Sequence, residues 1–176
     1  MRISMCLALA HDLERRIQLG RLFEADALLT RYAGSCDGDR AKQERDGFFR
    51  RKLADYRITP GARHGVMKEM FGIFKDLEVL GQDWPDFASR ADRVLYAEGE
   101  TAYGEMRTAF LDGPAAGRLP LWREQLMVYF VFTYFCGAVY NNSPFRKMKM
   151  AAASTLLIEE LAMAAWQQHG RQMGFL

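Results

Sequence analysis

Apolar residues recur at three- and four-residue steps along most of the chain, and no segment shows a sustained alternation of apolar and polar positions bounded by turn residues. The first pattern is typical of amphipathic helices and the second of strands, so the sequence predicts an all-α protein. Helices are expected at about residues 5–20, 21–33, 66–80, 84–95, 100–111, 119–141 and 144–168. The prediction is a single-domain bundle of about seven to eight helices.

The last two of these helices are the most apolar. Residues 126–140 carry no charge, but they are fewer than the roughly 20 residues that a membrane span requires, so a buried core helix is expected. Asn141, Asn142, Ser143 and Pro144 favour a tight reversal, with Ser143 as N-cap and Pro144 as first helical residue. The sequence therefore predicts a C-terminal helical hairpin whose first helix, 119–141, is the central helix, with other helices packed on every side of it.

Domain organisation follows from the chain length and from one polar segment. A chain of 176 residues can bury a substantial core, so one helical domain over 1–176 is expected. Residues 34–47 are rich in glycine and charged residues and have little to bury, which predicts a mobile loop.

Composition restricts the partners. A net charge of +2, with acidic and basic residues interspersed, argues against a nucleic-acid partner. The three cysteines, Cys6, Cys36 and Cys136, form no C-x-x-C pair and no signal peptide precedes them, so a cytoplasmic protein without a membrane partner is expected. The helical pattern offers no sheet for a nucleotide, so a cofactor site would have to lie between helices.

One charged residue stands out on the last helix. At 100° per residue, Glu159 falls on the side of that helix that should face the core, and an antiparallel hairpin brings it within reach of Arg123. Tyr129 or Tyr134 could add a hydroxyl. Two readings remain open: a structural ion pair that locks the hairpin, or a carboxylate that lines a pocket. Glu160, by contrast, joins a polar arc with other charged and amide side chains, namely Arg146, Lys149, Gln167 and Gln168.

Other candidate groups are weaker. The aromatic residues of the segment 129–140 are expected to form core, with a ligand cavity as the functional alternative. His11, His64 and His169 have no acidic neighbours in the sequence that would orient them, so each is expected to be a solvated surface residue.

Several segments resemble the flagellin lysine-N-methylase family, in its C-terminal half. They are ISMCLALA at 3–10, LEVL at 77–80 followed by Trp84, MVYFVFTYF at 127–135, AVY at 138–140 and STLLI at 154–158. Only Cys6 matches a family cysteine, and Leu7 stands where the family pattern has proline. The cysteine-rich N-terminal region of the family is not part of this sequence.

The resemblance implies S-adenosylmethionine-dependent methylation of lysines of flagellin, the protein of the bacterial flagellum. It makes Glu159, Tyr129 and Tyr134 candidate catalytic residues, and Arg123 a candidate cofactor-binding residue. The family's iron–sulfur cluster is not expected in this chain alone, and Cys6 would ligate metal only with ligands from another chain. A cysteine-rich N-terminal half would be a partner besides flagellin, and the chain, as a truncated or separately encoded half, is expected not to methylate flagellin alone. The alternatives are a non-catalytic helical interaction module and a ligand-sensing helical domain.

Overall fold

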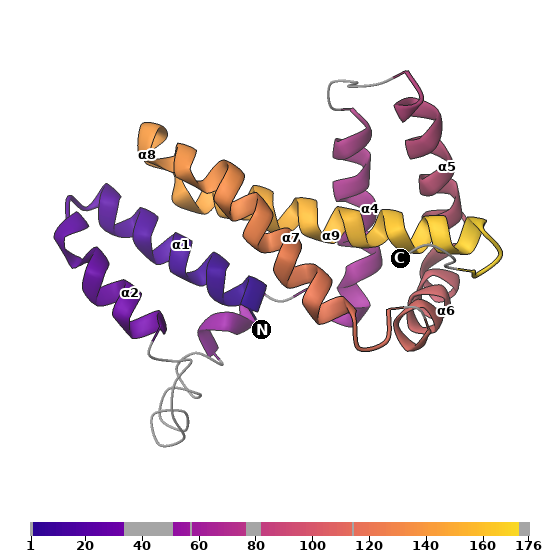
Figure 1. Cartoon of the computed structure of the whole chain (residues 1–176), viewed down its shortest axis with the longest axis horizontal. Coiled ribbons are helices and arrows are strands. Elements are labelled where there is room, and N and C mark those ends of the chain that lie inside the picture. The colour runs from indigo at the N-terminus through magenta and orange to yellow at the C-terminus, as the bar shows by residue number, and fades with distance from the viewer. Residues whose placement is uncertain (1, 34–50, 57, 77–81, 114, 173–176) are drawn as a thin grey trace. The chain divides into compact units, whose positions relative to one another are not determined.

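The computed structural model describes residues 2–33, 51–56, 58–76, 82–113 and 115–172, and every regular element in these ranges is helical (Figure 1). The α-helices are α1 (Arg2–Gln18), α2 (Ala25–Ala33), α4 (Pro60–Lys75), α5 (Trp84–Tyr96), α6 (Gly99–Asp112), α7 (Leu119–Tyr134), α8 (Ala138–Asn141) and α9 (Pro144–Gln168), with 3₁₀ turns at Leu22–Glu24 and Phe135–Gly137. The all-α prediction is confirmed. The predicted mobile loop at 34–47 lies outside the described residues.

The chain divides into two compact units. The first comprises Met1–Arg57 and Leu126–Ala152, and the second comprises Ile58–Gln125 and Ala153–Leu176. The chain passes from one unit to the other within α7 and within α9, so neither unit is one continuous stretch of sequence. The predicted single domain spans both.

In the first unit, α1 and α2 form a helical pair (Figure 1). Small alanines on α1 allow close packing: Ala8 lies against Leu28 and Tyr32 of α2, and Ala10 belongs to a second cluster. That second cluster contains Met127 of α7 together with three residues of α9, namely Met148, Ala151 and Ala152. The part of the C-terminal hairpin that lies toward its turn is thus part of this unit's core.

The hairpin forms, but its first arm is interrupted. Continuous helix was expected over 119–141, whereas α7 ends at Tyr134 and a 3₁₀ turn that ends at Gly137 separates it from α8. Glycine is a poor helix former, because its backbone loses more conformational freedom than that of other residues. Asn142 then adopts a left-handed conformation with φ of 51°, and Pro144 begins α9 as predicted.

The expectation that this arm is packed on every side is wrong for α7. Val128 and Phe132 are 62% and 83% exposed, and Tyr140 of α8 is exposed as well. A run of apolar residues does not specify which of its faces receives a partner, and here only part of α7 does. None of the described helices combines the length and apolar character needed to cross a membrane.

The second unit packs α4, α5 and α6 with the C-terminal part of α9. Its core joins Phe71, Leu95, Phe110 and Met163, one from each of the four helices, and all are nearly or completely buried. Side chains from four helices therefore converge on one centre. A short connection leads from α5 into α6 because Gly99 takes a φ of 86°, a conformation that other residues rarely adopt.

This core predicts a contrast between two apolar positions of α4. Replacing Phe71, which is fully buried, by alanine removes its contacts and leaves a cavity, so the free energy of unfolding should fall by about 3–5 kcal/mol. Ile73 on the same helix is exposed, and Ile73→Ala should stay within about 0.5 kcal/mol of the unmodified chain. Urea denaturation followed by circular dichroism measures both, and equal losses would contradict the assigned core.

Candidate functional site

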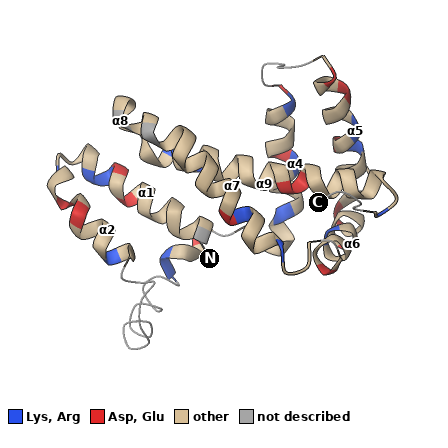
Figure 2. Ribbon diagram, viewed as in Figure 1, with Lys and Arg blue, Asp and Glu red and all other residues tan. Residues whose placement is uncertain are grey.

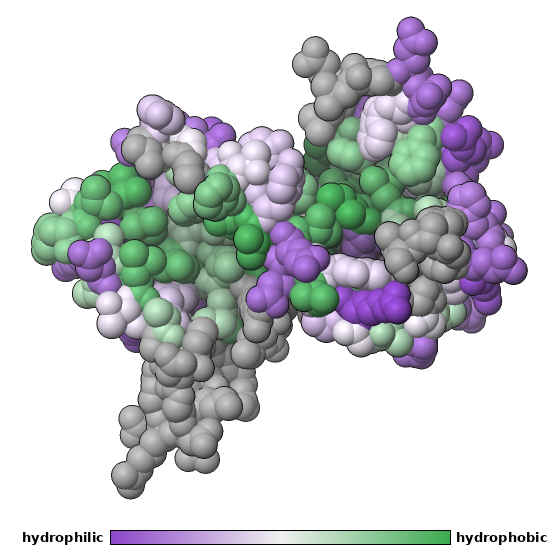
Figure 3. All heavy atoms as spheres, in the orientation of Figure 1, coloured by the Kyte–Doolittle hydropathy of each residue, from purple (hydrophilic) through white to green (hydrophobic). Residues whose placement is uncertain are grey.

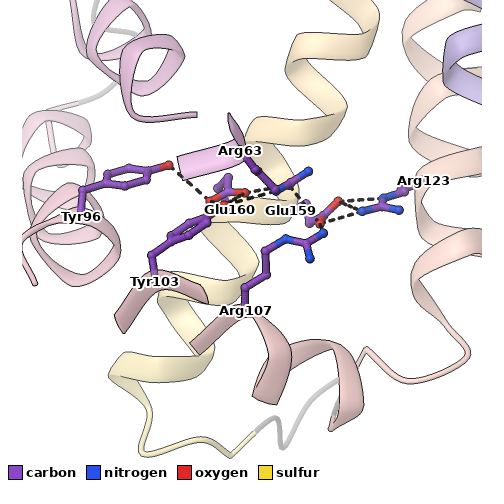
Figure 4. A network of polar contacts seen from close by, with 7 residues as sticks. All are labelled: Arg63, Tyr96, Tyr103, Arg107, Arg123, Glu159 and Glu160. Atoms are coloured by element: carbon purple, nitrogen blue, oxygen red, sulfur yellow. Dashed lines mark hydrogen bonds and ion pairs between the residues drawn. The ribbon is translucent and has the colours of Figure 1, made fainter. Parts of the chain in front are cut away.

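The second unit encloses a network of seven polar side chains (Figure 4). They come from all five helices that contribute to the unit: Arg63 from α4, Tyr96 from α5, Tyr103 and Arg107 from α6, Arg123 from α7, and Glu159 and Glu160 from α9. Figure 2 shows the acidic residues of α9 beside basic residues of α4 and α7. Charged groups thus lie inside the unit, where they must be paired.

Glu160 is the most deeply buried member, with an exposed fraction of 0%. Its Oε1 accepts hydrogen bonds from Nη2 of Arg63 at 2.8 Å and from the hydroxyl of Tyr103 at 2.9 Å. Its Oε2 accepts from the hydroxyls of Tyr103 at 3.0 Å and Tyr96 at 3.3 Å. One guanidinium and two phenols therefore replace the water that an exposed carboxylate would bind.

Glu159 is also buried, but its partners are guanidinium groups. Arg123 donates two hydrogen bonds of 2.8 Å to it, from Nε to Oε2 and from Nη2 to Oε1, and Nη2 also lies 2.7 Å from Oε2. The same Oε1 lies 3.2 Å from Nη2 of Arg63 and 3.4 Å from Nη2 of Arg107. The predicted contact between Arg123 and Glu159 is confirmed, and it involves both oxygens of the carboxylate.

Arg63 connects the two carboxylates. Its Nη2 reaches both Glu159 and Glu160, and its Nε donates to the hydroxyl of Tyr103 at 3.2 Å. Burial by itself would lower the pKa of Arg63, but the two neighbouring carboxylates outweigh burial and raise it. Arg63 is therefore held in its charged form at the centre of the network.

The two tyrosines are fixed as neutral donors. Burial, followed by the negative charge of Glu160, raises the pKa of both Tyr96 and Tyr103 above the ordinary value. Their rings stack at 5.7 Å, and the ring of His64 stands edge-on to both. Nε2 of His64 is buried and has no hydrogen-bond partner among the described residues.

Arg107 is held less completely. Its only hydrogen bond among the described residues is the 3.4 Å contact with Glu159, and its buried Nε has no partner there. Burial, and then the nearby charge of Arg63, lowers the pKa of Arg107. Together with Arg63 and Arg123, Arg107 brings the network to three guanidinium groups for two carboxylates.

Two expectations are corrected here. Glu160 was placed on a polar arc of α9, but it is fully buried because α4, α5 and α6 also cover that side of the helix in the second unit. His64 was expected to be solvated, but it packs on Tyr96 and Tyr103. Arg63 was not singled out at all, although it extends the apolar face of Met67 and Phe71 by one helical turn.

The remaining candidates lie in the first unit. Tyr129 and Tyr134 of α7 are exposed, and each ring packs on that of Phe130. Cys6 of α1 is a free thiol partly buried against an apolar cluster, and burial raises its pKa. The hydroxyls that reach the buried carboxylates are instead those of Tyr96 and Tyr103, and the catalytic and cofactor-binding roles of the candidates stay predictions.

Fold and site together define an all-α domain organised around a buried network of arginine, glutamate and tyrosine. Residues 1–174 match the model of the family described as the FliB lysine N-methylase C-terminal domain, so the chain belongs to that family. This confirms the resemblance seen in the sequence. No curated protein and no solved structure matched the chain.

The network predicts a large effect of removing Arg63. In Arg63→Met, the fully buried Glu160 loses its only guanidinium among the described residues, so the free energy of unfolding should fall by about 3–5 kcal/mol. Adding Glu160→Gln should recover part of this loss, because the side chain at position 160 then carries no unpaired charge. Arg90→Met, at an exposed position of α5, is the matched control, and urea denaturation is the measurement. An Arg63→Met variant as stable as this control would contradict the assigned pairing.

The tyrosines predict a pH dependence. Because the pKa of Tyr96 and of Tyr103 is higher in the folded chain than in the unfolded one, their contribution to stability is complete below about pH 10 and is lost as the pH rises further. Tyr103→Phe should unfold more easily at neutral pH by about 1–3 kcal/mol, since Glu160 loses a donor, and should lose less stability between neutral and alkaline pH.

The control for this experiment is Tyr140→Phe, at a residue that is almost fully exposed. It should behave as the unmodified chain at both pH values. Thermal unfolding across the alkaline range measures the effect, and an unchanged pH profile in Tyr103→Phe would contradict the assignment.

Proposed function

We propose that this domain takes part in S-adenosylmethionine-dependent methyl transfer to lysine side chains of flagellin. The observation that carries the proposal is the family match, which covers nearly the whole chain. S-adenosylmethionine, when bound, supplies an activated methyl group on a sulfonium. The protein's task is then to align a lysine amine with that group and to keep the amine unprotonated.

The donors of the buried network suit the carboxylate of S-adenosylmethionine better than its sulfonium or its ammonium group. Both oxygens of Glu159 and both oxygens of Glu160 already accept hydrogen bonds, so neither carboxylate is free to face a sulfonium or an ammonium group. Arg107 retains donor capacity that suits a carboxylate. In this proposal Glu159 acts by holding Arg107 and Arg123 in place, rather than as a base.

The iron–sulfur cluster of the family does not fit the described part of the chain. No group of three or more histidine, cysteine, aspartate or glutamate side chains in that part could hold a metal. The proposal therefore routes no step through a cluster in this chain, and a cysteine-rich partner would supply it.

A second candidate function is a helical interaction module without catalysis. The exposed side chains of Val128, Tyr129 and Phe132 on α7 favour it, because exposed apolar patches often mark protein contacts. Figure 3 shows hydrophobic residues at the surface of the first unit on the face in view. This candidate predicts association of the purified chain and no binding of the methyl donor in calorimetry.

The proposed function is tested by methyl transfer to purified flagellin. We expect no methylated lysines with the chain and S-adenosylmethionine alone, and methylated lysines when a cysteine-rich N-terminal region from a family member is added. Mass spectrometry of flagellin peptides is the measurement, and reactions without the donor are the control. Methylation by the chain alone would contradict its expected inactivity, and no methylation in the completed mixture would contradict the proposed function.

A further inference from the structure

The described network contains one more positive charge than negative charges. Arg63, Arg107 and Arg123 surround two carboxylates, and both carboxylates are engaged by shorter contacts from the other groups. An unbalanced charge in a poorly hydrated site is unfavourable unless a counter-charge joins it. The excess falls on Arg107, because its contact with Glu159 is the longest in the network, at 3.4 Å.

The geometry of Arg107 shows where a counter-charge would bind. Nε and Nη2 of a guanidinium lie on one edge, which Arg123 uses to grip Glu159. In Arg107 the same edge is only half used: Nη2 makes the long contact, and Nε is buried with no partner among the residues described. The side chain of Arg107 is 24% exposed, but its Nε is buried, so this edge meets a solute only when the side chain turns outward.

We propose that Arg107 binds the carboxylate group of a small-molecule ligand through its Nε and Nη2 edge. A single carboxylate can accept hydrogen bonds from both Nε and Nη2 of this edge, and its charge balances the excess of one positive charge. A phosphate dianion would overcompensate that charge. Beyond the effect of burial, the positive charge of Arg63 lowers the pKa of Arg107. A bound carboxylate would counteract this effect, because it places a negative charge beside Arg107.

This site goes beyond the proposed function, because it concerns binding and requires no methyl transfer. Two sources offer the same chemistry: a free organic acid, or the amino-acid end of S-adenosylmethionine. Binding to the second source would rest on the proposed function, so the probes must separate the two.

The experiment uses the whole chain and isothermal titration with four probes. Acetate represents a free carboxylate, and inorganic phosphate represents the competing anion. S-adenosylhomocysteine carries the amino-acid end, and 5′-methylthioadenosine is the related nucleoside without it. The variants are Arg107→Gln, which removes charge and fork, and Arg107→Lys, which keeps the charge alone. Arg118→Gln, at an exposed position of the same unit, is the matched control.

We expect saturable binding of acetate or S-adenosylhomocysteine that weakens at least tenfold in Arg107→Gln and Arg107→Lys, and is unchanged in Arg118→Gln. Circular dichroism and thermal unfolding confirm that the variants are folded, and Arg107→Lys provides the test if Arg107→Gln does not fold. Dependence on Arg107 for S-adenosylhomocysteine, without binding of 5′-methylthioadenosine, identifies the amino-acid end, and dependence for acetate alone identifies a free acid.

Three results would overturn the proposal: no binding of either carboxylate probe, binding that is indifferent to Arg107, or binding of phosphate alone. A failure of the proposed function, rather than of this carboxylate site, would give a different result. Flagellin would then remain unmethylated in the completed mixture, while acetate binding that depends on Arg107 persisted.

Discussion

The second unit depends on the pairing of two consecutive buried carboxylates, Glu159 and Glu160. Neighbouring residues of a helix point about 100° apart, so a single partner beside α9 cannot satisfy all the oxygens of both. Arg63 lies where its Nη2 reaches an oxygen of each, and the remaining oxygens are satisfied from different directions. Burying the two charges without these partners would cost several kcal/mol each. The packing of the unit must therefore place these partners beside the two carboxylates and bury the apolar core at the same time.

This requirement ties the helices of the unit to one another. Each of α4, α5 and α6 contributes an apolar residue to the core and at least one polar residue to the network, as α6 does with Phe110 and Tyr103. Hydrogen bonds to a charged carboxylate are directional, whereas apolar contacts tolerate some sliding. The network therefore selects one register among the many that the apolar surfaces would allow.

The same arrangement distinguishes the residues whose hydrogen bonds hold the unit together from one residue, Arg107, that still has unused hydrogen-bond donors. Arg63, Tyr96 and Tyr103 donate to Glu160, and Arg63 and Arg123 donate to Glu159. Arg107 is partly buried and partly exposed, and its donors are incompletely used. Arg107 is therefore the member of the network on which the proposed carboxylate site rests.

The sequence by itself determined the helical class, the start of α9 at Pro144 and the contact between Arg123 and Glu159. Helical periodicity and turn chemistry are local, and equal rise along the two arms of a hairpin fixes which of their residues lie at the same level. Only the tertiary structure decided that Glu160 is buried and that Arg63 pairs with it, because Arg63 is almost a hundred positions away in the chain. The exposure of Phe132 was decided in the same way, since an apolar helix does not specify which of its faces its neighbours will cover.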